Sequence, residues 1–415
     1  MKEKMAAVFR AVNGSPSANM EKVISMMGGI ETLVGTDDIV IIKPNLQWFN
    51  QGAPNILAMN TLITLIMEKK TGFKGEVVIA ENVHRGPKPW ETGGWSCLFN
   101  RNSDIPGISN YNELAARLKE RYGNRFSVCH LVDIGKGTKR VYSPSDGPGC
   151  VLCDGSGDIP LLSISNGLTG KDRRDVIMSY PILKTDRGTL VDYRYGVWES
   201  GSYTRQPVKF INCAALNHHS SYCGMTSSVK NYLGVSDLTG GSDPFHGGRL
   251  TKDYYNFHSF SFNRSAKGPV PGMLGAEVGF FLSTVRKPFL NITTAEYCGL
   301  IDRTDLPVAH TRVIAASTDP VALDFHMAKY VLYPNSLVPV HNPENPKSPT
   351  YQYLARCARI GGYCFDEGRV DIESFDFSNH STQSDDKLMV RGETQWGGNF
   401  RALLKYTAFR MKLVG

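Results

Sequence analysis

The sequence predicts an α/β fold with mainly parallel sheets and flanking helices, arranged as two α/β lobes with a cleft at the carboxyl ends of the strands. Short runs of consecutive apolar residues recur along the chain, and such runs are typical of strands that are buried on both faces. Segments with helical spacing separate several of these runs, as parallel pairing with right-handed crossovers requires. At 415 residues the chain can hold one large or two ordinary domains.

The first part of the chain alternates between strand and helix signals. Residues 39–42 are four consecutive apolar residues, which predicts a buried strand. The predicted strands are 5–12, 38–42, 76–80 and 125–132, and the predicted helices are 17–27, 56–70 and 110–122. Residues 84–107 and 135–158 are rich in Gly and Pro and are predicted to be irregular, and long loops of this kind are often functional.

The second part repeats this alternation less regularly. The predicted strands are 175–180, 208–213, 289–293 and 311–316, and the predicted helices are 273–285, 321–332, 351–359 and 400–414. The last helix is amphipathic and could contact a membrane surface, although packing on the body of the protein is the commoner arrangement. We divide the chain into an N-terminal lobe (1–170), a second lobe (171–345) and a C-terminal helical or irregular extension packed on the body (346–415).

Composition and charge exclude several classes of protein. The net charge of +7 is spread over single and paired cations, so the chain lacks the concentrated basic face of a nucleic-acid-binding protein, although a small anionic ligand is compatible with it. The sequence contains no run of ~18 consecutive apolar residues, so it predicts no membrane span. Nine cysteines, an odd number in a long chain, favour a reducing compartment, and the N-terminus lacks a signal peptide, so we expect a cytoplasmic protein. A chain whose leader has been removed would look the same, and a homo-oligomer is compatible with this composition.

Polar side chains follow the apolar runs at five places. Ligands of parallel α/β sheets bind beyond the carboxyl ends of the strands, so these side chains are candidates for a common site. Polar loop residues occur wherever a strand stops, but enrichment in Lys, Asn, Glu, His and Asp favours a site over ordinary loops. The residues in question are Lys43 and Asn45, Glu81, Lys184, His219, and Asp319.

Two of these strand ends continue into segments with helical signals. Thr226 suits a helix N-cap that would attract an anion, and Lys230 lies one turn further, although a capped surface helix with a solvated lysine explains the same spacing. His219 could act as a general base or a metal ligand, or could be a structural histidine. Asp319 before Pro320 is an ordinary helix start, which leaves Asp324 as the acid that is harder to explain structurally.

The common catalytic and metal-binding motifs are missing. The chain contains no GxxxxGK[ST], GxGxxG before a helix, GxSxG or HExxH. Cys150 and Cys153 form its single CxxC, without a second pair for a zinc site and without the four-cysteine run of a ferredoxin. The two cysteines could be a thiol couple or a chance match.

Four blocks of the sequence, taken in order, resemble the family called domain of unknown function 362. The blocks are Ile41-Ile42-Lys43-Pro44-Asn45, Pro181-Ile182-Leu183-Lys184-Thr185, His219 with Gly224 to Gly234, and Ser317 to Asp324. The resemblance implies functional positions at Lys43, Asn45, Lys184, His219, Thr226, Lys230, Asn231, Asp319 and Asp324. Some relatives carry a ferredoxin-like module that this chain lacks. This chain departs from the family at two places. Thr185-Asp186-Arg187 follows Lys184 where the family often has a histidine, and the loop after His219 is one residue longer than in the family.

These observations lead to three hypotheses. In the first, the protein is an enzyme acting on a small anionic molecule that Lys43, Lys184 and Lys230 bind, while His219 with Asp324 or Glu81 moves a proton or holds a metal. In the second, it is a redox or metal-handling accessory protein, as the iron–sulfur modules of the relatives and the Cys150/Cys153 pair suggest. In the third, it binds a small molecule without catalysis through the aromatic loop that contains Trp90, Trp95 and Phe99. The cofactor is unknown, and a divalent metal is left open.

Overall fold

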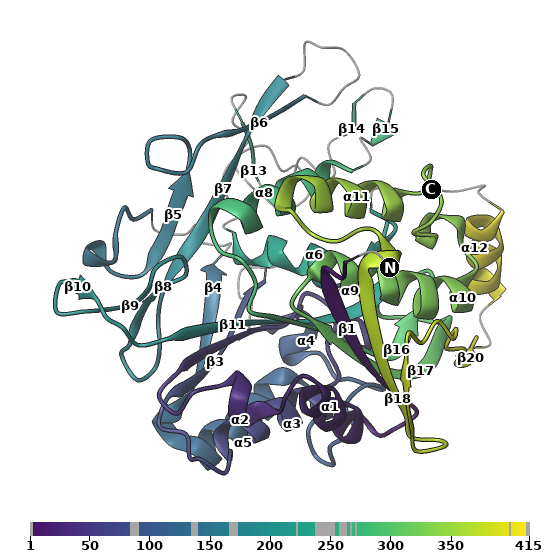
Figure 1. The fold of residues 1–415 in the computed structure, drawn as a ribbon, viewed down its shortest axis with the longest axis horizontal. Coiled ribbons are helices and arrows are strands. Elements are labelled where there is room, and N and C mark those ends of the chain that lie inside the picture. Colours follow the sequence, from purple (N-terminus) through teal and green to yellow (C-terminus); the bar gives the residue numbers. More distant parts are fainter. Residues whose placement is uncertain are drawn as a thin grey trace.

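The centre of the protein is a large mixed β-sheet, as a computed structural model shows (Figure 1). The structure describes residues 3–83, 91–133, 140–165, 173–220, 223–236, 254–256, 264–265, 268–269, 272–397 and 400–411. The strand order is β19-β18-β1-β17-β16-β11-β2-β3-β4, with β12 paired to β11 and β20 paired to β17. The strands are β1 (Ala6–Val12), β2 (Ile39–Lys43), β3 (Glu76–Val83), β4 (Phe126–Asp133), β11 (Val208–His218), β12 (Met225–Thr226), β16 (Leu290–Gly299), β17 (Val308–Ser317), β18 (Val370–Asp376), β19 (Ser381–Ser384) and β20 (Glu393–Gln395).

One half of this sheet is parallel and the other half is mixed. The neighbours β16, β11, β2, β3 and β4 all run in the same direction. Beyond β16, the strand β17 is antiparallel to both β16 and β1, and β18 is parallel to β1 and antiparallel to β19. Only the parallel half therefore has the strand ends of several neighbours at one edge.

A second sheet, predominantly antiparallel, lies beside the first (Figure 1). Its strands are β5 (Gly149–Cys153), β6 (Leu162–Ser165), β7 (Arg173–Lys184), β8 (Leu190–Asp192), β9 (Gly196–Glu199), β10 (Ser202–Tyr203) and β13 (Tyr254–Asn256), and β14 (Arg264–Ser265) pairs separately with β15 (Gly268–Pro269). The strand β7 is antiparallel to β5, β6 and β8 and parallel to β13.

The prediction of mainly parallel sheets in two α/β lobes is therefore wrong. Two connections explain the error. Strands β16 and β17 are joined by residues 300–307 without a helix, and such a short connection makes an antiparallel pair. Strand β7 turns directly into β8 through residues 185–189, so it belongs to a hairpin and not to a βαβ unit.

Helices cover both faces of the large sheet. In Figure 1 the helices α1, α2, α3 and α5 lie below the sheet, and α6, α8, α9 and α11 lie above it. The α-helices are α1 (Pro16–Met26), α2 (Ile30–Leu33), α3 (Ile56–Met67), α4 (Gly93–Ser96), α5 (Tyr111–Tyr122), α6 (Ser228–Asn231), α8 (Met273–Thr284), α9 (Pro320–Met327), α10 (Tyr333–Ser336), α11 (Pro349–Gly361) and α12 (Phe400–Arg410). Short 3₁₀ turns are η1 (Asn50–Gly52), η3 (Gly123–Arg125), η4 (Pro144–Asp146), η5 (Tyr232–Val235), η7 (Pro339–His341) and η8 (Glu367–Arg369), and a π-turn, η6 (Ala328–Leu332), continues α9.

The hydrophobic core forms two large clusters, one on each face of the large sheet, and a small third cluster that contains Leu300 and Tyr406. Alternate residues of β2 divide between the two large clusters: Ile39 and Ile41 join the cluster under α8, α9 and α11, and Val40 and Ile42 join the cluster over α1, α3 and α5. A strand buried on both faces reads as a continuous apolar run, which is why the sequence revealed β2.

The segments that follow residue 345 contribute to the large sheet as well as to the helical layer. Strands β18, β19 and β20 belong to that sheet, which also takes strands from residues 1–170 and 171–345. The three-part division of the chain stays a prediction. In the described ranges, none of the helices has the length and apolar character that crossing a bilayer requires.

Candidate functional site

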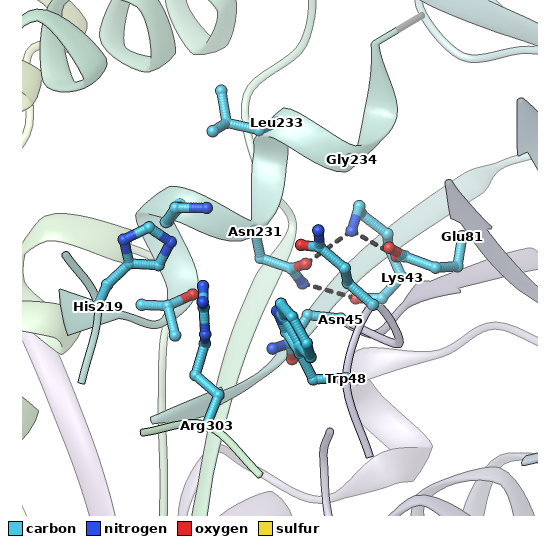
Figure 2. A pocket seen from close by; sticks show the side chains of 12 residues that line it. Lys43, Asn45, Trp48, Glu81, His219, Asn231, Leu233, Gly234 and Arg303 are labelled. Atoms are coloured by element: carbon cyan, nitrogen blue, oxygen red, sulfur yellow. Dashed lines mark hydrogen bonds and ion pairs between the residues drawn. The ribbon is translucent and has the colours of Figure 1, made fainter. Parts of the chain in front are cut away.

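A cavity lies at the carboxyl edge of the parallel half of the large sheet (Figure 2). It measures about 40 Å³, which leaves room for roughly three water molecules or one small polyatomic group. Its lining residues are Lys43, Asn45, Gln47, Trp48, Glu81, His219, Thr226, Lys230, Asn231, Leu233, Gly234 and Arg303. Most of the site residues predicted from the sequence are in this set.

Four neighbouring parallel strands bring these side chains together. Lys43 is the last residue of β2, Glu81 lies near the end of β3, His219 follows β11, and Arg303 follows β16. Because β16, β11, β2 and β3 are parallel neighbours, their carboxyl ends meet along one edge. This is the place where open α/β sheets bind their ligands.

Lys43 is buried at the back of the cavity and uses all three of its ammonium protons within the protein. Its Nζ donates to Glu81 Oε2 at 2.5 Å, to Asn231 Oδ1 at 2.6 Å and to the carbonyl of Pro44 at 2.9 Å. An ammonium has three donors, so Lys43 has none left for a ligand. We therefore assign Lys43 to the organisation of the site, and not to direct anion binding as the sequence suggested.

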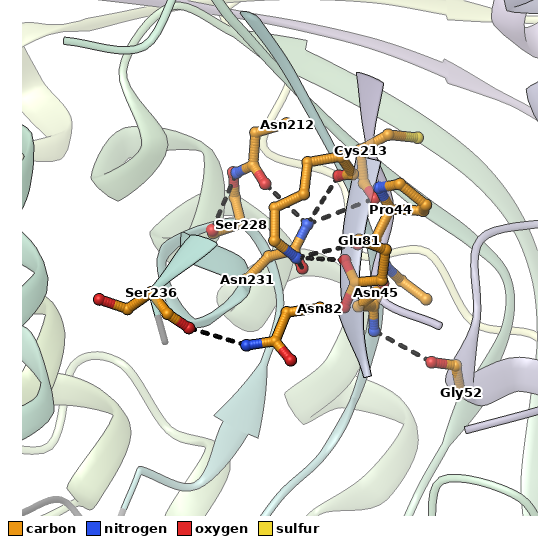
Figure 3. Close-up of polar contacts among 12 residues, drawn as sticks. Pro44, Asn45, Gly52, Glu81, Asn82, Asn212, Cys213, Ser228, Asn231 and Ser236 are labelled. Carbon is orange, nitrogen blue, oxygen red and sulfur yellow. Dashed lines mark hydrogen bonds and ion pairs between the residues drawn. The ribbon is translucent and has the colours of Figure 1, made fainter. Parts of the chain in front are cut away.

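Asn231 connects this lysine to the strands behind it (Figure 3). Its Nδ2 donates to the backbone carbonyl of Lys43 at 3.0 Å and to Asn212 Oδ1 at 2.7 Å. Asn212 in turn donates through Nδ2 to the backbone carbonyl of Ser228 at 2.9 Å. Each amide has one orientation that satisfies these contacts, so the network fixes where Lys43 points.

Asn45 stabilises the loop that follows β2 through two hydrogen bonds. Its Nδ2 donates to the carbonyl of Gly52 at 3.0 Å, and its Oδ1 accepts from the backbone N–H of Ala215 at 2.8 Å. These bonds tie the loop after β2 to the neighbouring strand β11. Asn45 lines the cavity while its amide holds the wall in place.

Gly234 is required for the close packing of the Lys43–Glu81 pair. A Cβ atom at this position would lie 2.6 Å from Lys43 Nζ, 2.8 Å from Lys43 Cε and 3.2 Å from Glu81 Oε1. Real Cβ atoms do not come that close to a neighbour, so a side chain at residue 234 would displace the ion pair.

Burial shifts the proton affinities of the pair in opposite directions. It raises the pKa of Glu81 to about 7, and Lys43 and the backbone N–H of Leu46 oppose that shift. It also lowers the pKa of Lys43, which the charge of Glu81 opposes. A carboxyl group with a pKa near neutrality can both accept and release a proton at physiological pH.

The opposite side of the cavity is cationic. Lys230 and Arg303 line it together with His219, and Figure 2 shows the side chains of His219 and Arg303 facing the same space. The guanidinium of Arg303 lies 4.6 Å from the ring centroid of Trp48, a cation–π contact that fixes its direction. Glu81 is the one acid among the lining residues in the described ranges, and Lys43 balances its charge.

His219 uses one ring nitrogen for a local contact. The backbone N–H of Ser220 donates to His219 Nδ1 at 2.7 Å. A neutral ring whose Nδ1 accepts a proton donor carries its own hydrogen on Nε2. In this tautomer Nδ1 accepts from Ser220 and Nε2 carries a hydrogen, so Glu81 is a better candidate than His219 for a proton acceptor.

The helix that carries Lys230 is capped in a way that the sequence did not predict. Thr226 was predicted as the N-cap, which is wrong: it belongs to β12, and the N-cap is Ser227, which makes no side-chain cap bond. Asp324, distant in sequence, replaces it by accepting from the backbone N–H groups of Ser228 at 2.9 Å and Val229 at 2.8 Å.

Asp324 thus holds the first residues of α6 in place and is not among the residues that line the cavity. It is buried, and burial raises its pKa to about 7 against the two backbone bonds. Asp319 is likewise structural, since its carboxylate accepts from Val321, Ala322 and Cys364 backbone N–H groups. It follows β17, whose antiparallel direction takes it to the other edge of the sheet.

Lys184 lies outside the site. It is the last residue of β7 in the second sheet, and its side chain is exposed. The turn after it contacts the start of β3, where Thr185 Oγ1 and Thr189 Oγ1 each donate to Glu76 at 3.1 Å. Lys184 is therefore next to the amino edge of the parallel strands, whereas the cavity is at their carboxyl edge.

Sequence reasoning missed Arg303, Trp48 and Gln47. The predicted strand 289–293 stopped six residues short of the end of β16 at Gly299, so the polar end containing Arg303 was overlooked. Gln47 and Trp48 lie two and three residues after Asn45. A search for polar and aromatic residues that extended a few positions beyond the strand end would have found them.

The predicted thiol couple and aromatic loop have structural explanations. Cys150 and Cys153 lie three positions apart on β5, and residues at odd separations on a strand point to opposite faces. All nine cysteines are in the described ranges and none forms a disulfide. Trp95 and Phe99 are buried in the core around Tyr111, and Trp90 lies outside the described residues.

In the part of the chain that the structure describes, no three His, Cys, Asp or Glu side chains come together as a metal site. Comparison of the chain with family models, with curated proteins and with solved structures finds no match. The geometry of the cavity is therefore the basis for assigning a function to the protein.

Proposed function

We propose that the cavity binds a small anionic molecule, a carboxylate or a phosphate, and that the protein is an enzyme that moves a proton on this molecule through Glu81. The observation that carries the proposal is the charge of the lining residues that the structure describes: Lys230 and Arg303 are cationic, His219 adds an imidazole, and the one acid, Glu81, forms an ion pair with Lys43. A lining with more cationic than anionic side chains favours a small anionic ligand.

The two cations differ in what they can recognise. The planar fork of Arg303, oriented by Trp48, suits two oxygens of one carboxylate or phosphate group. Lys230 acts as a point charge from α6, and its position depends on the Asp324 cap. A proton on the bound molecule that faces Glu81 could pass to a carboxyl group whose pKa is about 7.

The resemblance to domain of unknown function 362 agrees with this proposal as far as Lys43, Asn45, His219, Thr226, Lys230 and Asn231 are concerned, since all of them line the cavity. Membership of that family and a cytoplasmic location stay predictions. The opposite faces taken by Cys150 and Cys153 remove one of the two observations that favoured a redox accessory protein.

Calorimetric titration with inorganic phosphate and with succinate tests the binding step. Lys230→Met and Arg303→Met should each weaken binding by roughly 10- to 100-fold, the effect of losing one hydrogen bond to a charged group of about 1.5–3 kcal/mol. Lys184→Met removes the same charge from the other edge of the sheet and should leave binding unchanged. Equal affinities in all variants, or an equal loss in Lys184→Met, would contradict the proposed site.

The proton-transfer step has a separate test. If either anion binds, protein in which Glu81 is replaced by Gln should still bind it within a fewfold, because Lys230 and Arg303 are unchanged. In the Glu81→Gln protein, proton exchange on the bound molecule should be lost. Deuterium incorporation from D₂O into a succinate-type probe measures this exchange. Binding without exchange in the native protein would favour a non-catalytic binding protein.

A further inference from the structure

Helix α12 presents two different apolar faces, and only one of them packs on the protein. On the inner face Tyr406 is buried, donates its hydroxyl to the carbonyl of Ser336 at 2.6 Å and contacts the Trp396 ring edge-to-face. Phe409 packs against the ring of His218 at a centroid distance of 5.0 Å. This face attaches the helix to the body.

The outer face is also apolar, and it is exposed. Phe400 is 71% exposed, Leu403 47%, Leu404 54% and Met411 63%. Residues 400, 403, 404 and 411 follow the three- and four-residue spacing of one helix face, so they form a continuous stripe along α12. Figure 1 shows α12 at the periphery of the molecule, far from the second sheet.

Cations flank this stripe. With 3.6 residues per turn, Lys405 and Arg410 lie on opposite sides of it, and both are exposed. Lys405 Nζ is 3.5 Å from Asp302 of the body, so one nearby acid partly balances it. The sequence 400–415 contains four cations, Arg401, Lys405, Arg410 and Lys412, and no acid.

We propose that the outer face of α12 binds the surface of an anionic membrane. An exposed apolar stripe bordered by Lys and Arg is the arrangement of helices that lie in the plane of a bilayer interface, with apolar side chains among the acyl chains and cations at the headgroups. Trp396, which is partly exposed directly before the helix, is of the residue type enriched at that depth.

A second copy of the chain fits this surface less well. The stripe is about 16 Å long and about 10 Å wide, or roughly 160 Å², whereas stable protein interfaces bury ~800 Å² on each partner. Pairing two such helices would also bring Lys405 and Arg410 of one copy against the cations of the other. A lipid surface removes both difficulties, because it extends beyond the stripe and carries the opposite charge.

Co-sedimentation of the full chain with vesicles tests the proposal. The protein should sediment with vesicles of phosphatidylcholine and phosphatidylserine and much less with phosphatidylcholine alone. Leu403→Ser with Leu404→Ser should reduce the partition by about tenfold or more, and Arg410→Glu by at least about fivefold. Tyr142→Ser removes a similarly exposed apolar side chain beside β5 and should change nothing.

The outcomes separate the occupants of the surface. Because Leu403 and Leu404 are exposed, their replacement should leave the thermal unfolding midpoint unchanged, which a melt verifies. No sedimentation of the native protein with anionic vesicles would overturn the proposal, as would sedimentation that the leucine variant retains. A dimer in light scattering that the leucine variant abolishes, without vesicle binding, would assign the stripe to self-association.

Discussion

Lys43 and Lys184 end two apolar strands in the same way, yet the folded protein uses them differently. Lys43 follows Ile41-Ile42 and becomes a buried cation with three partners inside the candidate site. Lys184 follows Ile182-Leu183 and becomes an exposed side chain at the start of a hairpin turn. The local sequence does not distinguish the two residues.

The direction of the neighbouring strands makes the difference. Strand β2 lies between β11 and β3 and runs parallel to both, so its end meets theirs at one edge. Strand β7 pairs with antiparallel neighbours, so strand ends alternate with strand starts along its sheet. Polar residues at strand ends gather into a site only where adjacent strands share a direction.

The largest effect that tests this comparison is on stability. Lys43→Met should lower the free energy of unfolding by about 3–5 kcal/mol, because it leaves the Glu81 carboxylate buried without its cation. Lys184→Met should change it by less than about 0.5 kcal/mol, as for other exposed positions. Urea denaturation of the two variants measures both values.

A double variant makes the first prediction sharper. Lys43→Met with Glu81→Gln leaves no buried charge, so it should recover part of the stability that Lys43→Met alone loses. Similar losses for Lys43→Met and Lys184→Met would mean that the buried ion pair does not distinguish the two strand ends.

A smaller effect is expected at Gly234. Gly234→Ala places a methyl group against Lys43 Nζ and Cε and should cost about 1–3 kcal/mol, the usual range for overpacking. Gly157→Ala, near the second sheet, is the matched control because its added Cβ would have no atom within 4 Å. Denaturation midpoints compare the two, and a Gly234→Ala protein as stable as the control would contradict the close packing described for the ion pair.

The last expected effect is a dependence of stability on pH at Asp324, measured per pH unit. Burial raises the pKa of this carboxyl from 3.8 to about 7, so its contribution to stability is fully present below pH ~4 and is lost as the pH rises through ~7. In Asp324→Asn this dependence should disappear. The stability difference between the native protein and the variant should therefore shrink with rising pH, by at most about 1.4 kcal/mol per pH unit.

Urea denaturation at several pH values between 4 and 8 measures this difference. The variant also loses one of the two acceptors for the Ser228 and Val229 N–H groups, which adds a constant offset but no slope. A difference that stays constant across the window would show that Asp324 is not protonated near neutrality.

The elements buried on both faces were the easiest to predict from the sequence. The runs at 38–42 and 76–80 and the helices at 17–27 and 56–70 correspond to β2, β3, α1 and α3 within a few residues. Strands with one polar face, such as β18 with its alternating Val370 and Ile372, were missed because a half-buried strand is less apolar.

Most of the candidate site was predicted for a related reason. Lys43, Glu81 and His219 follow long apolar runs, and three such strands are parallel neighbours, so the rule for strand ends applied to them. Lys184 and Asp319 satisfied the same local pattern in strands with antiparallel neighbours, where the rule does not hold.

The sequence by itself determined the strands that are buried on both faces, the helices with clear apolar spacing, and which polar residues stand at their ends, because these follow from local periodicity and from the need to bury apolar side chains. Only the tertiary structure decided which strands are parallel neighbours, that Asp324 rather than Thr226 caps the helix of Lys230, and that Arg303 completes the cavity. These depend on contacts between residues about 40 or more positions apart, which local pattern does not encode.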